Sequence, residues 1–150
     1  MSINPHLKTV GTILTMSDGK DVLPFYSARG MSQTMVPIGA AKSQRRTVNF
    51  ELINLALLRS RKYASVISSK DLRPPSRDDV WPGKTVVVGC AYLSSYPTVG
   101  GSPARDVVSG SQFSDGHGFT FYRALITFMI VDIQGSFDEW QAGYSWSISM

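Results

Sequence analysis

Few side chains in this sequence are of the types that carry out chemistry. The 150 residues include one cysteine, Cys90, and two histidines, His6 and His117. Nucleophilic catalysis would need Cys90 or a serine beside a histidine, with a carboxylate behind that histidine. His6 lies in a stretch that we expect to fray, and His117 lies in DGHG (115–118), a pattern typical of a tight turn before a strand. Because the nucleophile-elbow spacing is also missing, we predict that the protein is not an enzyme.

Metal ions and phosphate groups also lack ligands at the required spacing. One cysteine and two distant histidines provide no pair at zinc spacing, and Asp71, Asp78 and Asp79 lack the alternating oxygen ligands of a calcium loop. GGS (100–102) has neither the lysine nor the strand-to-helix context of a phosphate-binding loop. We therefore predict no catalytic, metal-binding or cofactor-binding residues, and we interpret these stretches as solvated turns and loops.

Positive charge is concentrated in one part of the chain. The net charge is +4, yet the segment from Lys42 to Arg77 holds nine basic residues against Glu51 and Asp71. Such asymmetry is typical of a polyanion-binding face, or of a surface that docks on an acidic neighbouring subunit. We favour a basic surface that contacts other subunits or is merely solvated, because the basic residues are scattered in pairs and form no dense tract.

The alternative is a nucleic-acid-binding β-barrel that uses the basic 42–77 region. Tyr63 and Phe50 could stack on bases there while the basic side chains contact phosphates. We expect Phe50 to be buried, however, which argues against this function.

The elements that would position any site are strands, and the strongest strand pattern lies at the C-terminus. FTFYRALITFMIVDIQ (119–134) predicts one long aromatic strand, and a second one follows it. In the second strand apolar residues alternate with serines, the pattern of a strand with one buried face. These apolar residues are Tyr144, Trp146, Ile148 and Met150. We therefore expect the chain to end inside its hydrophobic core.

A central strand is predicted from Lys84 to Tyr92. This run is almost continuously apolar, as expected for a strand covered on both faces. Cys90 lies within it and should behave as a small buried hydrophobe, since it has no second cysteine to pair with.

A half-buried strand is predicted from about Arg46 to Leu55. Apolar residues alternate with polar ones in this stretch, at Val48, Phe50 and Leu52. A helical interpretation competes, because apolar residues also recur there at helical spacing. A short helical turn near Leu57 to Tyr63 and a short strand from Ala64 to Ser69 are expected to follow.

Four segments are predicted to be turns or irregular connections. Asp18-Gly19 between short apolar runs favours an opening hairpin of 12–16 and 20–26. Residues 72–82 contain three prolines and should form a surface loop. Ala28 to Gln44 and Ser94 to Gly118 are rich in small residues, so we expect an arm and a long loop that become ordered on partner subunits.

These elements indicate one all-β domain over residues 1–150, a β-sandwich or barrel with two long loops and at most one short helix. The N-terminal MSINPHLKTV lacks the basic start and apolar run of a signal peptide. The longest apolar stretch, Ala124 to Val131, is interrupted by Thr127 and falls far short of the ~20 apolar residues that a membrane helix needs. We therefore expect neither export by that route nor a transmembrane span.

Short motifs spread over most of the chain carry a family resemblance. They are YSARG (26–30), QT (33–34), RRTVN (45–49), RKY (61–63), IS (67–68), VWPG (80–83), FTFYR (119–123), FDEW (137–140) and Trp146. The chain resembles small tail-associated virion structural proteins of tailed bacteriophages. The resemblance implies a compact β-rich subunit without catalytic residues or cofactors, in which Pro82-Gly83 turns into the central strand and Trp81 packs over its start.

The resemblance also implies partners and a location. Such proteins assemble as homo-oligomers and contact neighbouring tail, tail-tip or neck proteins. For this chain we accordingly expect a place in the virion, after assembly in the host cytoplasm.

Overall fold

The computed structural model describes residues 14–18, 20, 22–23, 31–38, 44–55, 62–71, 78 and 80–150. Within these residues every regular element is a β-strand, and no helix has the length and hydropathy to cross a membrane. The strands are β1 (Thr15–Ser17), β2 (Ser32–Ile38), β3 (Gln44–Arg46), β4 (Leu52–Asn54), β5 (Lys62–Asp71), β6 (Thr85–Pro97), β7 (Asp106–Val107), β8 (Phe113–Ser114), β9 (Phe119–Met129), β10 (Asp132–Asp138) and β11 (Gly143–Ser149).

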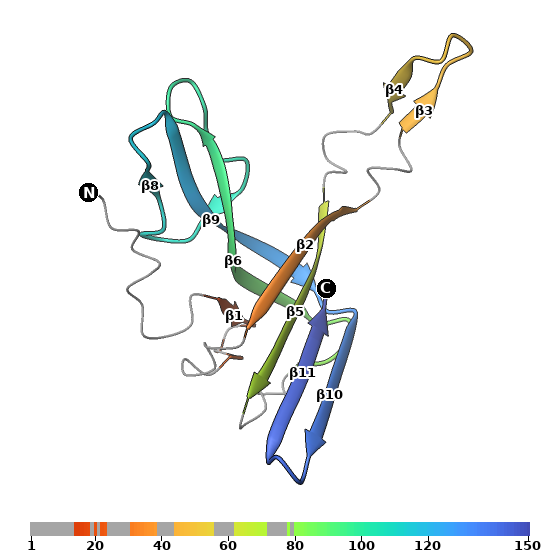
Figure 1. Cartoon of the computed structure of the whole chain (residues 1–150), viewed down its shortest axis with the longest axis vertical. Coiled ribbons are helices and arrows are strands. Elements are labelled where there is room, and N and C mark those ends of the chain that lie inside the picture. Colours follow the sequence, from red (N-terminus) through yellow and green to blue (C-terminus); the bar gives the residue numbers. More distant parts are fainter. Residues whose placement is uncertain are drawn as a thin grey trace.

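The described residues form two antiparallel sheets and one separate hairpin (Figure 1). The first sheet has the order β1-β6-β9-β7, with β8 also paired to β9, and the second has the order β10-β11-β5-β2. The hairpin consists of β3 and β4. The two sheets share one hydrophobic core, so the predicted all-β, sandwich-like fold is confirmed.

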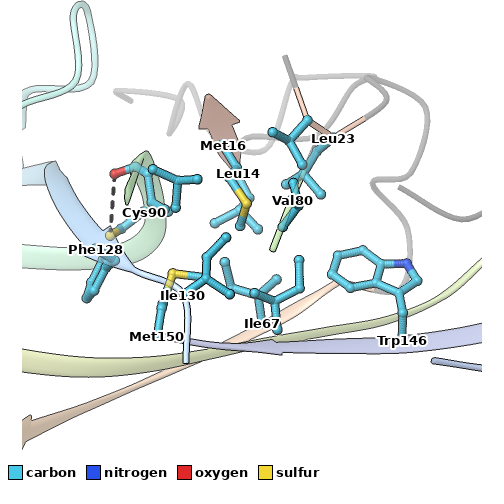
Figure 2. Packing of buried hydrophobic residues seen from close by; sticks show 14 residues of the cluster. Leu14, Met16, Leu23, Ile67, Val80, Cys90, Phe128, Ile130, Trp146 and Met150 are labelled. Atoms are coloured by element: carbon cyan, nitrogen blue, oxygen red, sulfur yellow. Dashed lines mark hydrogen bonds between the residues drawn. The ribbon is translucent and has the colours of Figure 1, made fainter. Parts of the chain in front are cut away.

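Apolar side chains from both sheets form this core. The terminal strand β11 contributes Trp146, which is only 3% exposed, and Met150 is buried just beyond the strand. Figure 2 shows Ile67, Trp146 and Met150 on one side of the core, with Met16 and Cys90 among the side chains opposite them. Full burial of a large apolar side chain contributes about 1.5 to 3 kcal/mol. The predicted burial is therefore confirmed for Trp146, Ile148 and Met150, whereas Tyr144 is only partly buried.

The prediction of one continuous strand over residues 119–134 is wrong. The chain leaves the first sheet after β9 and enters the second at β10, with Ile130 buried at the junction. The N–H of Ile130 donates to the carbonyl of Lys84 over 2.9 Å, and its carbonyl accepts from the N–H of Gly83 over 2.7 Å. The apolar pattern continues through this corner because the corner itself lies in the core.

The central strand β6 lies between β1 and β9, as predicted, but it is longer and is not covered on both faces. Val86 and Val88 are buried whereas Val87, between them, is partly exposed. The pairing of β6 with β9 shifts between Gly89 and Leu93, which marks a bulge. The three consecutive valines therefore belong to a strand with one buried face.

A side chain from the second sheet holds this bulge. The side-chain oxygen of Gln33, on β2, accepts hydrogen bonds from the N–H groups of Ala91 and Tyr92, over 2.8 and 3.4 Å. The amide nitrogen of Gln33 donates to the hydroxyl of Ser65 on β5 over 3.2 Å. Backbone groups that the bulge removes from the sheet ladder thus find a partner, and the two sheets are tied together.

Large parts of the two segments predicted to be irregular are paired strands. Residues 32–38 of the predicted arm form β2, which pairs along its whole length with β5. In the predicted 94–118 loop, β6 continues to Pro97, and β7 and β8 both pair with β9. The prediction of irregular segments is wrong there, because glycines and prolines also occur at the ends of strands and in edge strands. Residues 28–30 and 39–43 lie outside the described part.

The first described strand pairs differently from the prediction. β1 pairs with β6, while the predicted partner, residues 20–26, is described only at 20 and 22–23. The N–H of Val22 donates to the carbonyl of Met16 over 3.0 Å, so the chain does turn back after β1. Asp18 in this turn forms an ion pair with Lys84, and the hydrogen bond from Lys84 holds the pKa of Asp18 below its ordinary value.

The VWPG segment forms the expected turn. The N–H of Lys84 donates to the carbonyl of Trp81 over 3.0 Å, and Gly83 has a φ of 90°, which favours glycine. Trp81 is 74% exposed, so the prediction that it packs over the start of β6 is wrong, and Val80 is buried instead.

The predicted strand at 64–69 is confirmed within the longer β5, which also includes the last two positions of the predicted helical turn. Residues 57–61 of that turn and 72–77 of the proline-rich loop lie outside the described part.

Candidate functional site

Cys90 is part of the core, where its thiol has no access to solvent. Its side chain is fully buried, and its thiol donates a long hydrogen bond of 3.9 Å to the carbonyl of Val88 (Figure 2). Burial raises the pKa of the Cys90 thiol. A thiolate is therefore disfavoured, and the predicted role of Cys90 as a buried hydrophobe is confirmed. His6 lies outside the described residues.

His117 lies in a structural turn, as predicted. The carboxylate of Asp115 accepts hydrogen bonds from the N–H groups of His117, over 2.7 Å, and Phe119, over 3.2 Å. The bond from His117 is the main reason that the pKa of Asp115 lies below its ordinary value. Gly116 and Gly118 both have positive φ. The carboxylate thus supports the backbone of the loop before β9.

The predicted acidic turns do not gather into a site. In the described part of the chain, no three histidine, cysteine, aspartate or glutamate residues lie close enough to hold a metal ion. Asp71 ends β5 and Asp78 is exposed, whereas Asp79 is outside the described part. Gly100 has a positive φ in the turn after β6, as a loop residue would.

The β3–β4 hairpin is the most unusual surface that the structure describes. Val48 at its tip is 97% exposed and Phe50 is 79% exposed, and Leu52 and Leu55 also face solvent. The hairpin stands away from both sheets in Figure 1. The prediction that Val48, Phe50 and Leu52 form a buried strand face is therefore wrong. Among the described residues β3 and β4 pair only with each other, and no second layer covers them.

Backbone hydrogen bonds define the tip of this hairpin. The N–H of Phe50 donates to the carbonyl of Thr47, and the N–H of Thr47 donates to the carbonyl of Glu51, both over 2.9 Å. The hydroxyl of Thr47 also accepts from the N–H of Glu51 over 3.1 Å. This turn places Phe50 in the left-handed region, at φ 63°. Glycine is usual at this position of a three-residue hairpin loop, so a phenylalanine is strained there.

The hairpin is basic as well as apolar. Arg45 pairs with Ile53 and Arg46 pairs with Leu52. Because adjacent residues of a strand point to opposite faces, the two arginine side chains leave the hairpin on opposite faces. Arg46 donates to the carbonyl of Phe50 over 3.3 Å. Both arginines are exposed. The hairpin therefore offers an apolar tip with a cation on each face.

The turn between β10 and β11 offers a second exposed aromatic surface, of opposite charge. Trp140 is 95% exposed and Phe137 is 62% exposed, next to the exposed acidic residues Asp138 and Glu139. The carboxylate of Asp138 accepts from the N–H groups of Trp140, over 3.0 Å, and Gln141, over 3.3 Å. Asp138 thereby fixes the backbone that presents the indole ring.

A groove between the two sheets is a third candidate. The guanidinium carbon of Arg105 lies 5.5 Å from the ring centre of Tyr63. The hollows beside this pair have volumes of about 690 and 610 Å³. The charged residues among the described lining are Lys62, Arg105 and Asp106, so the groove is weakly basic.

The basic 42–77 region is not one surface in the part of it that the structure describes. Arg45 and Arg46 lie on the hairpin, whereas Lys62 and Lys70 lie near opposite ends of β5. Eight residues of a strand separate two side chains by about 26 Å. The other five basic residues of this region are outside the described part.

No protein-family model, curated protein or solved structure matches the chain. The candidate surfaces must therefore be interpreted from their own geometry. In the sequence Trp140 stands out only as part of the FDEW motif, and the alternating pattern predicts Phe50 in the core. The sequence does contain one signal for an exposed tip: Asn49, a residue that favours turns, lies in the middle of the alternating apolar pattern.

Proposed function

We propose that the protein is a structural subunit that assembles through protein–protein contacts, as a tail, tail-tip or neck component of a tailed-bacteriophage virion. The observation that carries the proposal is the exposure of Val48, Phe50 and Leu52 on the β3–β4 hairpin. The motif resemblance described for the sequence supports the assignment to a virion.

The energetics of the hairpin favour an interface. A two-stranded hairpin is marginally stable at best on its own. This one exposes apolar side chains that would each contribute about 1.5 to 3 kcal/mol on burial. Exposed apolar surface concentrated on a projecting element is typical of an interaction site. A partner surface is the natural place for these side chains to be buried.

The test is self-association and incorporation into particles. Sedimentation of the purified chain over a range of concentrations should show oligomers, and a Val48→Ser/Phe50→Ser variant should remain monomeric with an unchanged melting temperature. Val99→Ser is the matched control, because Val99 is almost fully exposed but lies outside the hairpin. A tagged chain expressed from its native genome should also co-purify with virion proteins.

Two results would contradict the proposal. One is a wild-type chain that stays monomeric at every concentration and is absent from purified particles. The other is a double-serine variant that enters particles as efficiently as the wild type.

Nucleic-acid binding is the second candidate, and one observation favours it. Phe50 is exposed beside Arg45 and Arg46, so the argument that it is buried and cannot stack is wrong. A hairpin with two arginines can neutralise few phosphates, however, which predicts weak binding with a shallow salt dependence. Titration of a single-stranded oligonucleotide at several salt concentrations distinguishes the candidates. Measurable affinity that falls with salt and is abolished by Arg45→Ala/Arg46→Ala would favour the nucleic-acid function.

A further inference from the structure

The two exposed tips lie at opposite ends of one sheet. The hairpin is inserted in the chain between β2 and β5, whose ends meet where Ile38 pairs with Lys62. The β10–β11 turn lies at the other end of β5, where Asp71 pairs with Tyr144. β5 has 10 residues, so these two ends are about 30 Å apart. Figure 1 shows the same arrangement, with the hairpin and the turn at opposite extremes of the molecule.

The tips also have complementary composition. One carries aliphatic and aromatic side chains with Arg45, Arg46 and Glu51, and is therefore basic on balance. The other carries two aromatic side chains with Asp138 and Glu139 and is acidic. Opposite charge around apolar anchors is the arrangement by which interfaces select a partner and a register.

We propose that the β3–β4 hairpin of one copy docks on the β10–β11 turn of the next copy. This inference rests on the proposed function, because it names the partner and the surface for the same hairpin. Phe50 and Val48 pack against Phe137 and Trp140 of the next copy, and the arginines meet the acidic residues of the turn. An arginine over the face of Trp140 adds a cation–π contact.

Strained backbone at both tips supports this pairing. In the described part of the chain, only Phe50 and Ala142 have positive φ without being glycine. One lies in each tip. Non-glycine residues in this region are costly, and they concentrate where the structure serves an interaction. Each strained tip also carries an exposed aromatic ring, Phe50 in one and Trp140 in the other.

The geometry determines the type of assembly. The contact joins two different surfaces, so each interior subunit uses both of its tips at once. Such head-to-tail contacts close into a ring if the rotation between copies permits it, and otherwise extend into a filament. The smallest ring has two copies, and in it each hairpin would meet the turn of the other copy.

The groove between the sheets is a poorer partner for the hairpin. Lys62 and Arg105 give its described lining a weakly basic character, which would repel Arg45 and Arg46. Docking of the hairpin in this groove is the main alternative to the proposed contact, and this repulsion argues against it.

Mixing two complementary variants tests the proposal. The hairpin variant is Val48→Ser/Phe50→Ser and the turn variant is Trp140→Ser. Each has one intact tip, so each alone should be monomeric. An equimolar mixture should form a 1:1 heterodimer and nothing larger. Trp140 would be a central contact residue, and its loss should weaken association at least ~30-fold, the equivalent of a 2 kcal/mol hot spot. Because Trp140 is almost fully exposed, the fold of the variant should be intact, as circular dichroism can verify.

Two controls sharpen this experiment. Trp81→Ser removes an exposed tryptophan outside both tips, and it should leave association unchanged. Arg45→Glu and Glu139→Arg should each weaken association. A mixture of the two variants should restore it, through one contact of native polarity and one of reversed polarity.

The outcomes separate this inference from the proposed function. If the wild type associates and the turn variant associates equally well, the head-to-tail pairing is wrong and the structural role stands. The same conclusion follows if Met129→Ser, in the groove lining, blocks association while Trp140→Ser does not. If the wild type neither associates nor enters particles, both proposals fail.

Discussion

Strand β11 and the β3–β4 hairpin have the same alternation of apolar and polar residues, but they differ in the burial of their apolar side chains. In β11 the apolar positions Trp146 and Ile148 are buried, whereas in the hairpin Val48 and Phe50 are exposed. β11 lies between β10 and β5, in a sheet whose inner face is covered by a second sheet. Among the described residues β3 and β4 have only each other. Alternation of apolar and polar residues indicates a strand. Whether the apolar face of that strand is buried depends on distant parts of the chain or on another molecule.

The largest expected difference between the two regions is in the cost of truncating an aromatic side chain. Trp146→Ala should lower the free energy of unfolding by about 3 to 5 kcal/mol, because it leaves a cavity in the core. Phe50→Ala should change it by less than about 0.5 kcal/mol, as expected for exposed positions. Urea titration of the isolated chain measures both values. Similar losses for the two variants would mean that the hairpin packs on the sheets in solution.

A smaller effect is expected from a substitution in the hairpin that changes stability and self-association in opposite directions. Phe50→Gly relieves the left-handed backbone at φ 63°, and it should stabilise the turn by up to about 1 kcal/mol. The same change removes the exposed ring, so it should weaken self-association. Thermal unfolding and sedimentation of the same preparation provide the two measurements. A variant that loses stability would show that the ring of Phe50 packs within its own subunit.

The smallest expected effect is the loss of stability at low pH that comes from Asp115, in the loop before β9. The pKa of Asp115 is lowered, chiefly by the hydrogen bond from the N–H of His117. A carboxyl whose pKa is lowered in the folded state adds stability above its unfolded pKa and loses it as the pH falls through the folded value. The wild type should therefore lose stability below about pH 4, and Asp115→Asn should lose less over the same range. Urea midpoints at pH 7 and pH 3 check this, and equal losses in both proteins would contradict it.

Much of the fold could be predicted from local patterns. The serine alternation after Gly143 placed Trp146 and Met150 in the core correctly, and the apolar setting of Cys90 indicated its burial. DGHG (115–118) and Pro82-Gly83 predicted turns that are present. These features depend on residues close together in the sequence, so the chain itself contains the information.

What could not be predicted depends on long-range pairing. Ile130 ends one sheet and begins the path to the other, yet nothing in its apolar surroundings indicates a corner. The local sequence of β2 predicts an irregular arm, because only the pairing with β5 makes this segment a strand. At the candidate site, the basic and acidic motifs were visible in the sequence, but their position at opposite ends of β5 follows only from the strand register.

The link made by Gln33 and the continuous pairing of the second sheet have a mechanical consequence for an assembly of this kind. Tension applied between the hairpin and the β10–β11 turn would run parallel to β5 and β11 rather than across them. The hydrogen bonds of that ladder would be loaded in shear, all together, instead of opening one after another. Gln33 joins the bulge of β6 to the same sheet, so the first sheet would share the load. A chain of such subunits would resist stretching along its axis far better than peeling at its side.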